Sequence, residues 1–102
     1  MTTLPAIEGA EALAEQIVEA SLAACVQILP RMTSVYVWEG EMQKEGEYLL
    51  LIKTLPEKWE ELRDFIAEHH TYDVPEMVAI DAEHVSASYK AWLAFALEQP
   101  NT

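Results

Sequence analysis

The stretch that decides the fold runs Thr33-Ser-Val-Tyr-Val-Trp-Glu-Gly-Glu-Met-Gln-Lys-Glu-Gly-Glu-Tyr-Leu-Leu-Leu-Ile-Lys-Thr54. Its first part, Thr33–Trp38, is rich in β-branched and aromatic residues, and its last part, Tyr48–Ile52, is an apolar run. A polar link that holds Gly40 and Gly46 joins the two parts. Two such runs joined by a short glycine-containing link predict a β-hairpin.

The second run is apolar on both of its faces. Tyr48, Leu50 and Ile52 would point to one face of the sheet, and Leu49 and Leu51 would point to the other. Such a strand needs cover on both faces. Helices can cover one face, and so short a chain has no segment left to build a second sheet. We therefore expect another copy of the chain to supply the second cover.

The segments before the hairpin predict a strand, a helix and a strand. A first strand ends at Pro5, and the apolar residues of Glu8–Ser21 recur with a helical period. Leu22–Leu29 predicts a strand that follows the helix directly. Pro30 cannot donate a ladder hydrogen bond, so it indicates a bulge or an edge.

The segments after the hairpin predict a helix, a strand and a helix. Thr54 and Glu57 fit a capping box, which opens a helix that ends near His69 and His70. A short strand is expected over Val74–Ile80. A last helix, capped by Ser86 or Ser88, would carry several large apolar residues, namely Tyr89, Trp92, Leu93, Phe95 and Leu97.

This order of elements is the ferredoxin-like βαββαβ plan with an extra C-terminal helix. The expected fold class is therefore an α+β sandwich with helices on one face of its sheet. At 102 residues the chain is expected to form a single domain over residues 1–102.

Composition excludes several classes of partner. Six basic residues against 18 acidic ones give a formal charge of −12, which repels nucleic acid and anionic lipid. No apolar run is long enough to span a membrane, and no signal peptide is apparent, so a cytoplasmic location is expected. The single Cys25 rules out an internal disulfide and is expected to be a buried small residue.

Six short strings at matching order and spacing resemble the CutA family, the divalent-cation-tolerance proteins. The resemblance covers nearly the whole chain, from about Thr3 to Leu97, and is carried by Leu22-Ala-Ala-Cys-Val26, Trp38-Glu-Gly40, Lys53-Thr54, His69-His70 followed by Tyr72, Pro75-Glu76, and the pair Tyr89 and Trp92.

The resemblance implies a non-enzymatic ferredoxin-like homotrimer in which long strands pack subunit against subunit. It also implies architectural kinship with the PII-type signalling trimers. The family is linked to tolerance of copper and other divalent metals, and animal relatives are linked to anchoring of acetylcholinesterase. No cofactor is required, and Cu²⁺ or another divalent cation is the candidate ligand.

Three departures from the family pattern stand out. Only Met1 and Thr2 precede Thr3, where the family has several apolar residues, so the first strand is expected to be truncated. Thr2 also stands where some bacterial members carry a Cys, and that thiolate ligand is lost. Thr71 replaces the family's proline between the histidine pair and Tyr72, which makes that turn less rigid.

His69 and His70 are the candidate metal ligands, with Glu76, Asp73 or a residue of a neighbouring subunit completing the site. Imidazole suits Cu²⁺, Ni²⁺ and Zn²⁺. Adjacent residues on a helix point about 100° apart, so the pair cannot serve one ion from one face. The structural alternative is that these imidazoles sit favourably at the C-terminal end of a helix dipole.

Lys53 and several aromatic residues are candidates for a ligand pocket where subunits meet. Lys53 ends a strand among aromatic and acidic residues, and a small anionic ligand would suit its charge. The alternative is that the aromatics are simply packed. The residues expected to line this pocket are Trp38, Glu39, Lys53, Tyr72 and Trp92, with Glu76 beside them.

Three functions are thus left open for the chain. The preferred one is a homotrimeric divalent-cation-tolerance protein that binds copper or another divalent cation weakly. The second is a PII-like signalling module that senses a small ligand in the cleft between subunits. The third is a trimeric scaffold for a protein partner. The sequence holds no recognisable catalytic motif, so an enzyme is not expected.

Overall fold

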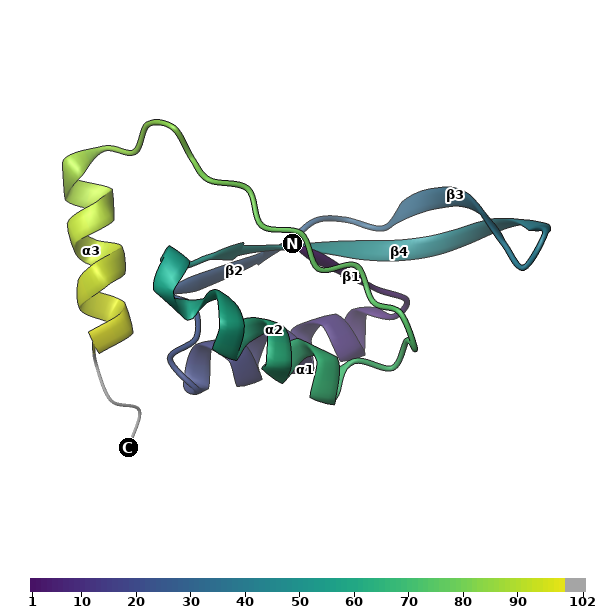
Figure 1. Ribbon diagram of the computed structural model, residues 1–102, viewed down its shortest axis with the longest axis horizontal. Coiled ribbons are helices and arrows are strands. Elements are labelled where there is room, and N and C mark those ends of the chain that lie inside the picture. The colour runs from purple at the N-terminus through teal and green to yellow at the C-terminus, as the bar shows by residue number, and fades with distance from the viewer. Residues whose placement is uncertain (99–102) are drawn as a thin grey trace.

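The computed structural model describes residues 1–98 as an α+β fold with a four-stranded antiparallel sheet (Figure 1). The fold class is as the sequence predicts. In chain order the elements are β1 (Thr2–Leu4), α1 (Ile7–Glu19), β2 (Cys25–Ile28), β3 (Met32–Trp38), β4 (Glu41–Lys53), the 3₁₀ turn η1 (Pro56–Lys58), α2 (Trp59–His69) and α3 (Ala87–Glu98).

The strand β4 organises the sheet because every other strand pairs with it. Its C-terminal half lies between β1 and β2, with Thr2 opposite Leu50 and Cys25 opposite Lys53. Its N-terminal half pairs with β3, from Met32 opposite Glu47 to Trp38 opposite Glu41. The β3–β4 hairpin therefore projects well beyond the rest of the sheet (Figure 1).

The hairpin turn is much shorter than the predicted polar link. Only Glu39 and Gly40 lie between the strands, and both have positive φ, 51° and 78°. This is the backbone that a two-residue turn matching the sheet twist requires. Glu41 to Gly46 belong to β4, because polar side chains are tolerated in a strand that is solvent-exposed.

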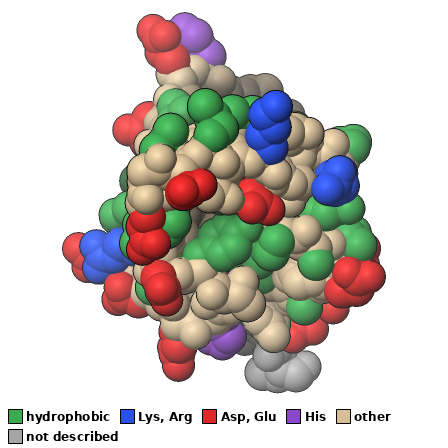
Figure 2. Space-filling view, turned by 90° about the vertical axis from the view of Figure 1, so that its right-hand side faces the viewer, with side chains coloured by type: hydrophobic (Ala, Val, Ile, Leu, Met, Phe, Trp, Pro, Cys, Tyr) green, Lys and Arg blue, Asp and Glu red, His purple; other side chains and the backbone are tan. Residues whose placement is uncertain are grey.

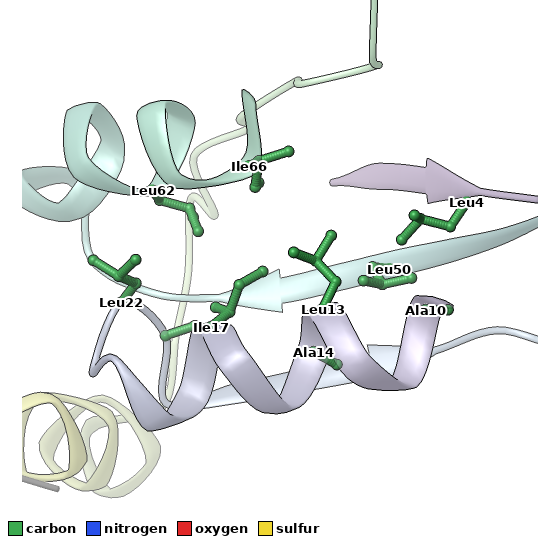
Figure 3. Packing of buried hydrophobic residues seen from close by; sticks show 10 residues of the cluster. Leu4, Ala10, Leu13, Ala14, Ile17, Leu22, Leu50, Leu62 and Ile66 are labelled. Carbon is green, nitrogen blue, oxygen red and sulfur yellow. The ribbon is translucent and has the colours of Figure 1, made fainter. Parts of the chain in front are cut away.

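The helices α1 and α2 cover one face of the sheet and enclose the core (Figures 1 and 3). Leu50 of β4 is fully buried at its centre. Small and branched side chains of α1 and α2 pack around it, namely Ala10, Leu13, Ala14, Ile17, Leu62 and Ile66. The helical period predicted over Glu8–Ser21 is confirmed in the four α1 residues of this set.

The predicted capping box at Thr54 is wrong. The Thr54 hydroxyl donates a hydrogen bond to the Leu22 carbonyl oxygen, at 2.8 Å, and so ties the end of β4 to the chain before β2. A 3₁₀ turn intervenes, and α2 begins only at Trp59. The strand predicted from Leu22 is likewise shorter and begins at Cys25.

The predicted strand Val74–Ile80 does not form in residues 1–98. Only Met1 and Val78 exchange backbone hydrogen bonds, at 2.7 and 3.2 Å. The next carbonyl oxygen on that side of β1, that of Thr3, accepts a hydrogen bond from the His70 side chain. This segment crosses over the sheet as an extended connection (Figure 1).

The last helix, α3, stands at the end of that connection, apart from α1 and α2 (Figure 1). The Ser86 hydroxyl accepts a hydrogen bond from the Tyr89 amide, which confirms Ser86 as the cap. Leu93 is buried, whereas Trp92 and Phe95 are 46% and 61% exposed. Within residues 1–98, no helix is long and apolar enough to cross a membrane.

Candidate functional site

A hollow of about 500 Å³ lies beside the hairpin and is the candidate site. Its walls come from β1, β3, β4 and the chain that follows α2. The lining residues are Thr3, Tyr36, Trp38, Glu47, Thr71, Tyr72, Asp73, Val74 and Glu76.

His70 fixes the chain that forms one wall of the hollow. Its Nε2 lies 2.7 Å from the Thr3 carbonyl oxygen, and its Nδ1 lies 3.0 Å from the Tyr72 amide nitrogen, which donates to it. These two partners require the neutral tautomer with its proton on Nε2. Both ring nitrogens are thus used within the chain.

Tyr72 and Glu47, which both line the hollow, join the chain after α2 to β4. The Tyr72 hydroxyl donates to the Glu47 Oε2 at 3.0 Å. Burial raises the pKa of Tyr72 to about 12, and the hydrogen bond to the Glu47 carboxylate and the nearby negative charges act in the same direction. Tyr72 is therefore a neutral donor throughout the physiological pH range.

The hollow is aromatic and negatively charged. Three of its lining residues are aromatic, and three others are carboxylates, Glu47, Asp73 and Glu76. Among the described residues that line it there is no Lys, Arg or His. Glu47 is only 6% exposed, and within residues 1–98 it forms no ion pair. On the end of the molecule where the hairpin projects, acidic side chains surround a central hydrophobic patch (Figure 2).

The predicted metal ligands do not gather into one site within a single chain. His69 is exposed; its Nδ1 lies 2.8 Å from the Phe65 carbonyl oxygen and its ring stacks on Phe65. His70 is occupied as described above, and Glu76 lines the hollow. In the described part of the chain, no three His, Cys, Asp or Glu residues group so as to hold a metal ion. Metal binding at these residues stays a prediction, with further donors coming from another copy.

The predicted pocket residues are divided among several places. Trp38 and Tyr72 meet in the hollow, with Glu76, and Glu39 lies in the adjacent hairpin turn. Lys53 lies at the far end of β4, beside a second hollow of about 890 Å³ whose lining also includes Trp59, Met77, His84 and Lys90.

Trp92 lies on α3 and stacks at an angle on Tyr89. A pocket that combines Lys53 with Trp38 is thus not formed within one chain, and across copies it stays a prediction.

Cys25 was expected to be buried, but it is half-buried. It lies opposite Lys53 in the pairing of β2 with β4.

Sequence reasoning missed Glu47 and Tyr36. A signal for Glu47 existed. Glu47, Leu49 and Leu51 are two residues apart from one another, so they share one face of the strand, and we expect another copy of the chain to cover that face. The role of Thr3 had no such signal, since only its backbone oxygen is used.

Comparison with known proteins agrees with this fold. The model of the family described as CutA1 divalent ion tolerance protein matches residues 1–95. The divalent-cation tolerance protein CutA of Thermus thermophilus is 40% identical over 93 residues, which cover 91% of this chain and 90% of that one. The chloroplastic protein CutA of Arabidopsis thaliana is 44% identical over 91 residues.

The match to the Arabidopsis protein covers 89% of this chain but only half the length of that relative. The human protein CutA is 36% identical, and its match also covers 89% of this chain and about half of the relative. Among solved structures, the periplasmic divalent cation tolerance protein CutA of Archaeoglobus fulgidus superposes with a TM-score of 0.92 at 34% identity, covering 95% of this chain and 94% of that one. The CutA1 of Oryza sativa gives a TM-score of 0.90 at 39% identity, covering 93% and 87%.

Sequence motifs, topology and these likenesses agree over residues 1–95, and the chain therefore belongs to the CutA1 divalent ion tolerance family.

Proposed function

We propose that this protein is a non-enzymatic homotrimer that acts in tolerance of divalent metal ions. Membership of the CutA1 family is the observation that carries the proposal, because its relatives are named for divalent-cation tolerance. Action in the cytoplasm and the absence of catalysis belong to the same proposal.

Exposed apolar side chains support assembly. On the hairpin, Val35, Val37 and Met42 are 59%, 63% and 66% exposed. Ile80 of the connection is 74% exposed, and α3 presents Phe95. Exposed apolar patches of this kind mark protein interfaces. A second and a third copy would cover them.

Sedimentation of the native protein tests the assembly. The expected mass is three times the 11.5 kDa of one chain. A compact, fully folded 11.5 kDa species at micromolar concentration would overturn the proposed trimer.

We assign weak Cu²⁺ binding to His69. Its Nδ1 is held by the Phe65 carbonyl oxygen, which orients the ring and would leave Nε2 to bind the ion, as backbone partners do for many metal-binding histidines. Glu76, or a carboxylate of another copy, would complete the coordination. His70 would first have to release Thr3 and Tyr72.

Calorimetric titration with Cu²⁺ tests this assignment. His69→Ala should weaken binding by about tenfold or more. His84→Ala is the matched control, because His84 is an exposed histidine, 3.9 Å from the Glu83 carboxylate, that takes no part in the assigned site. Equal affinity and stoichiometry in the wild type and in His69→Ala would remove the assigned site.

A PII-like sensor of a small ligand is the second candidate, and the hollow beside Lys53 and Lys90 favours it. Thermal-shift measurements with nucleotides and organic acids test it, because a bound ligand raises the apparent stability by mass action. No shift at millimolar ligand would exclude it and would leave a trimeric scaffold as the remaining alternative.

A further inference from the structure

The geometry points to the 500 Å³ hollow as a binding site for a small alkylammonium ion. This ligand class differs from the metal ions of the proposed function, and the inference does not depend on that function. It rests on the buried Glu47 carboxylate, on the aromatic walls around it and on the lack of a basic residue among the lining residues that the structure describes.

Glu47 supplies the negative charge. Glu47 is more than nine-tenths buried, and within residues 1–98 the one hydrogen bond that its side chain receives comes from the neutral Tyr72 hydroxyl. A buried carboxylate without a positive partner is costly. Within residues 1–98 no ion pair relieves that cost. A cation entering the hollow would do so.

Tyr36, Trp38 and Tyr72 supply the walls. Tyr36 and Trp38 are two residues apart on β3 and so lie on the same face of the hairpin as Glu47. Both are partly exposed, at 41% and 49%, although aromatic side chains of this size are normally covered. Aromatic faces attract cations, and tryptophan does so most strongly.

The donor set favours an organic cation over a bare metal ion. Aromatic rings cannot ligate a hard cation, which needs several oxygen ligands. The carboxylates Glu47, Asp73 and Glu76 do not group so as to hold a metal, and within residues 1–98 no such group occurs. The volume lies within the usual range for small-molecule sites. Anions would meet only like charge there.

Titration of the native, assembled protein with tetramethylammonium chloride tests the inference, with tryptophan fluorescence and calorimetry as readouts. Sodium chloride at equal ionic strength and the neutral analogue 2-methylpropan-2-ol are the solute controls. Saturable binding of tetramethylammonium alone, at millimolar concentration, is the expected result. Equal responses to all three solutes would overturn the site.

Two variants with matched controls localise the binding. Glu47→Gln keeps an acceptor for Tyr72 but removes the charge, and it should weaken binding about tenfold, whereas Glu45→Gln on the same strand face should not. Trp38→Leu should weaken binding and abolish the fluorescence response, whereas Tyr89→Leu, at an aromatic residue of similar exposure that does not line the hollow, should leave both intact. Trp38 is half-exposed, so its loss does not threaten the fold.

The ammonium group could also belong to a lysine of another copy. In that case the lysine would occupy the hollow of the assembled protein, and tetramethylammonium would bind only to a variant that lacks the lysine. Binding seen in Lys53→Gln and absent from the wild type would overturn the inference of a free ligand, since Lys53 is the partly buried lysine that ends β4. Equal binding by the wild type and Lys53→Gln supports it.

Discussion

His70 is a structural residue within the chain, although its place beside His69 suggests a metal ligand. Its two ring nitrogens hold the Thr3 carbonyl oxygen and the Tyr72 amide. It thereby fastens the segment after α2 to β1 and positions Tyr72 over Glu47. The adjacent His69, which uses one ring nitrogen, remains the better candidate for a ligand.

Replacement of His70 should therefore cost more stability than replacement of its neighbour. His70→Ala removes two hydrogen bonds and is expected to lower the free energy of unfolding by about 2 kcal/mol. His69→Ala removes one exposed hydrogen bond and should cost less than about 1 kcal/mol. Urea unfolding at one protein concentration measures both. Equal losses would contradict the fastening role of His70.

Tyr72 should make stability fall at high pH. Its pKa is about 12 in the folded protein against 10 ordinarily, so the protonated phenol stabilises the fold. That stabilisation is fully present below pH 10 and is lost as the pH rises through about 12. The loss should be on the order of 2 kcal/mol, because partial exposure reduces the full effect of the shift.

Urea unfolding of the wild type and of Tyr72→Phe at several alkaline pH values isolates this effect, because the other titrating groups are common to both. The difference in free energy of unfolding between the two proteins should shrink above pH 10. A constant difference across that range would show that the pKa of Tyr72 is not raised in the folded protein.

At the scale of elements, the hairpin turn has the positive φ angles that glycine adopts without strain. Gly40 has a φ of 78°, and a Cβ there would meet nothing within 4 Å, so a substitution acts through the backbone alone. Gly40→Ala should lower the free energy of unfolding by about 1 kcal/mol. Glu39→Asn should raise it by a few tenths, because Asn-Gly suits this turn best.

Gly9→Ala is the matched control for that prediction. Gly9 lies in α1, has an ordinary φ and also has open space around it. The same substitution there should stabilise the protein by about 0.5–1 kcal/mol. Thermal unfolding compares the two variants directly. Changes of the same sign in both would refute the backbone explanation.

The sequence predicts elements where a periodic apolar face meets the core, and fails where one tertiary contact overrides a local pattern. The spacing of Leu13 and Ile17 locates α1, and Ser86 locates the start of α3. Thr54 fits a cap but hydrogen-bonds Leu22, which no local pattern encodes. The candidate site depends on Tyr72 meeting Glu47, 25 residues away, so only its separate aromatic and acidic parts were predictable.

At the scale of the whole molecule, assembly must overcome like charge. Each copy carries a formal charge of −12, while the surfaces offered for contact are apolar. Salt screens repulsion between exposed charges over about 10 Å at 0.1 M ionic strength. Moderate salt should therefore tighten the assembly. Sedimentation velocity at low and moderate sodium chloride measures this, and dissociation on adding salt would instead indicate ion pairs between copies.

The strand β4 is one continuous element with two environments. Tyr48–Lys53 pairs with β1 and β2 over the core, whereas Glu41–Gly46 pairs, within residues 1–98, with β3 alone. A two-stranded ribbon alone is barely stable in water. Deuterium uptake should thus be slow in the inner half of β4 and fast in the outer half of an isolated copy. Contact with a neighbour would slow the outer half only, so peptides from this one strand would report folding and assembly separately.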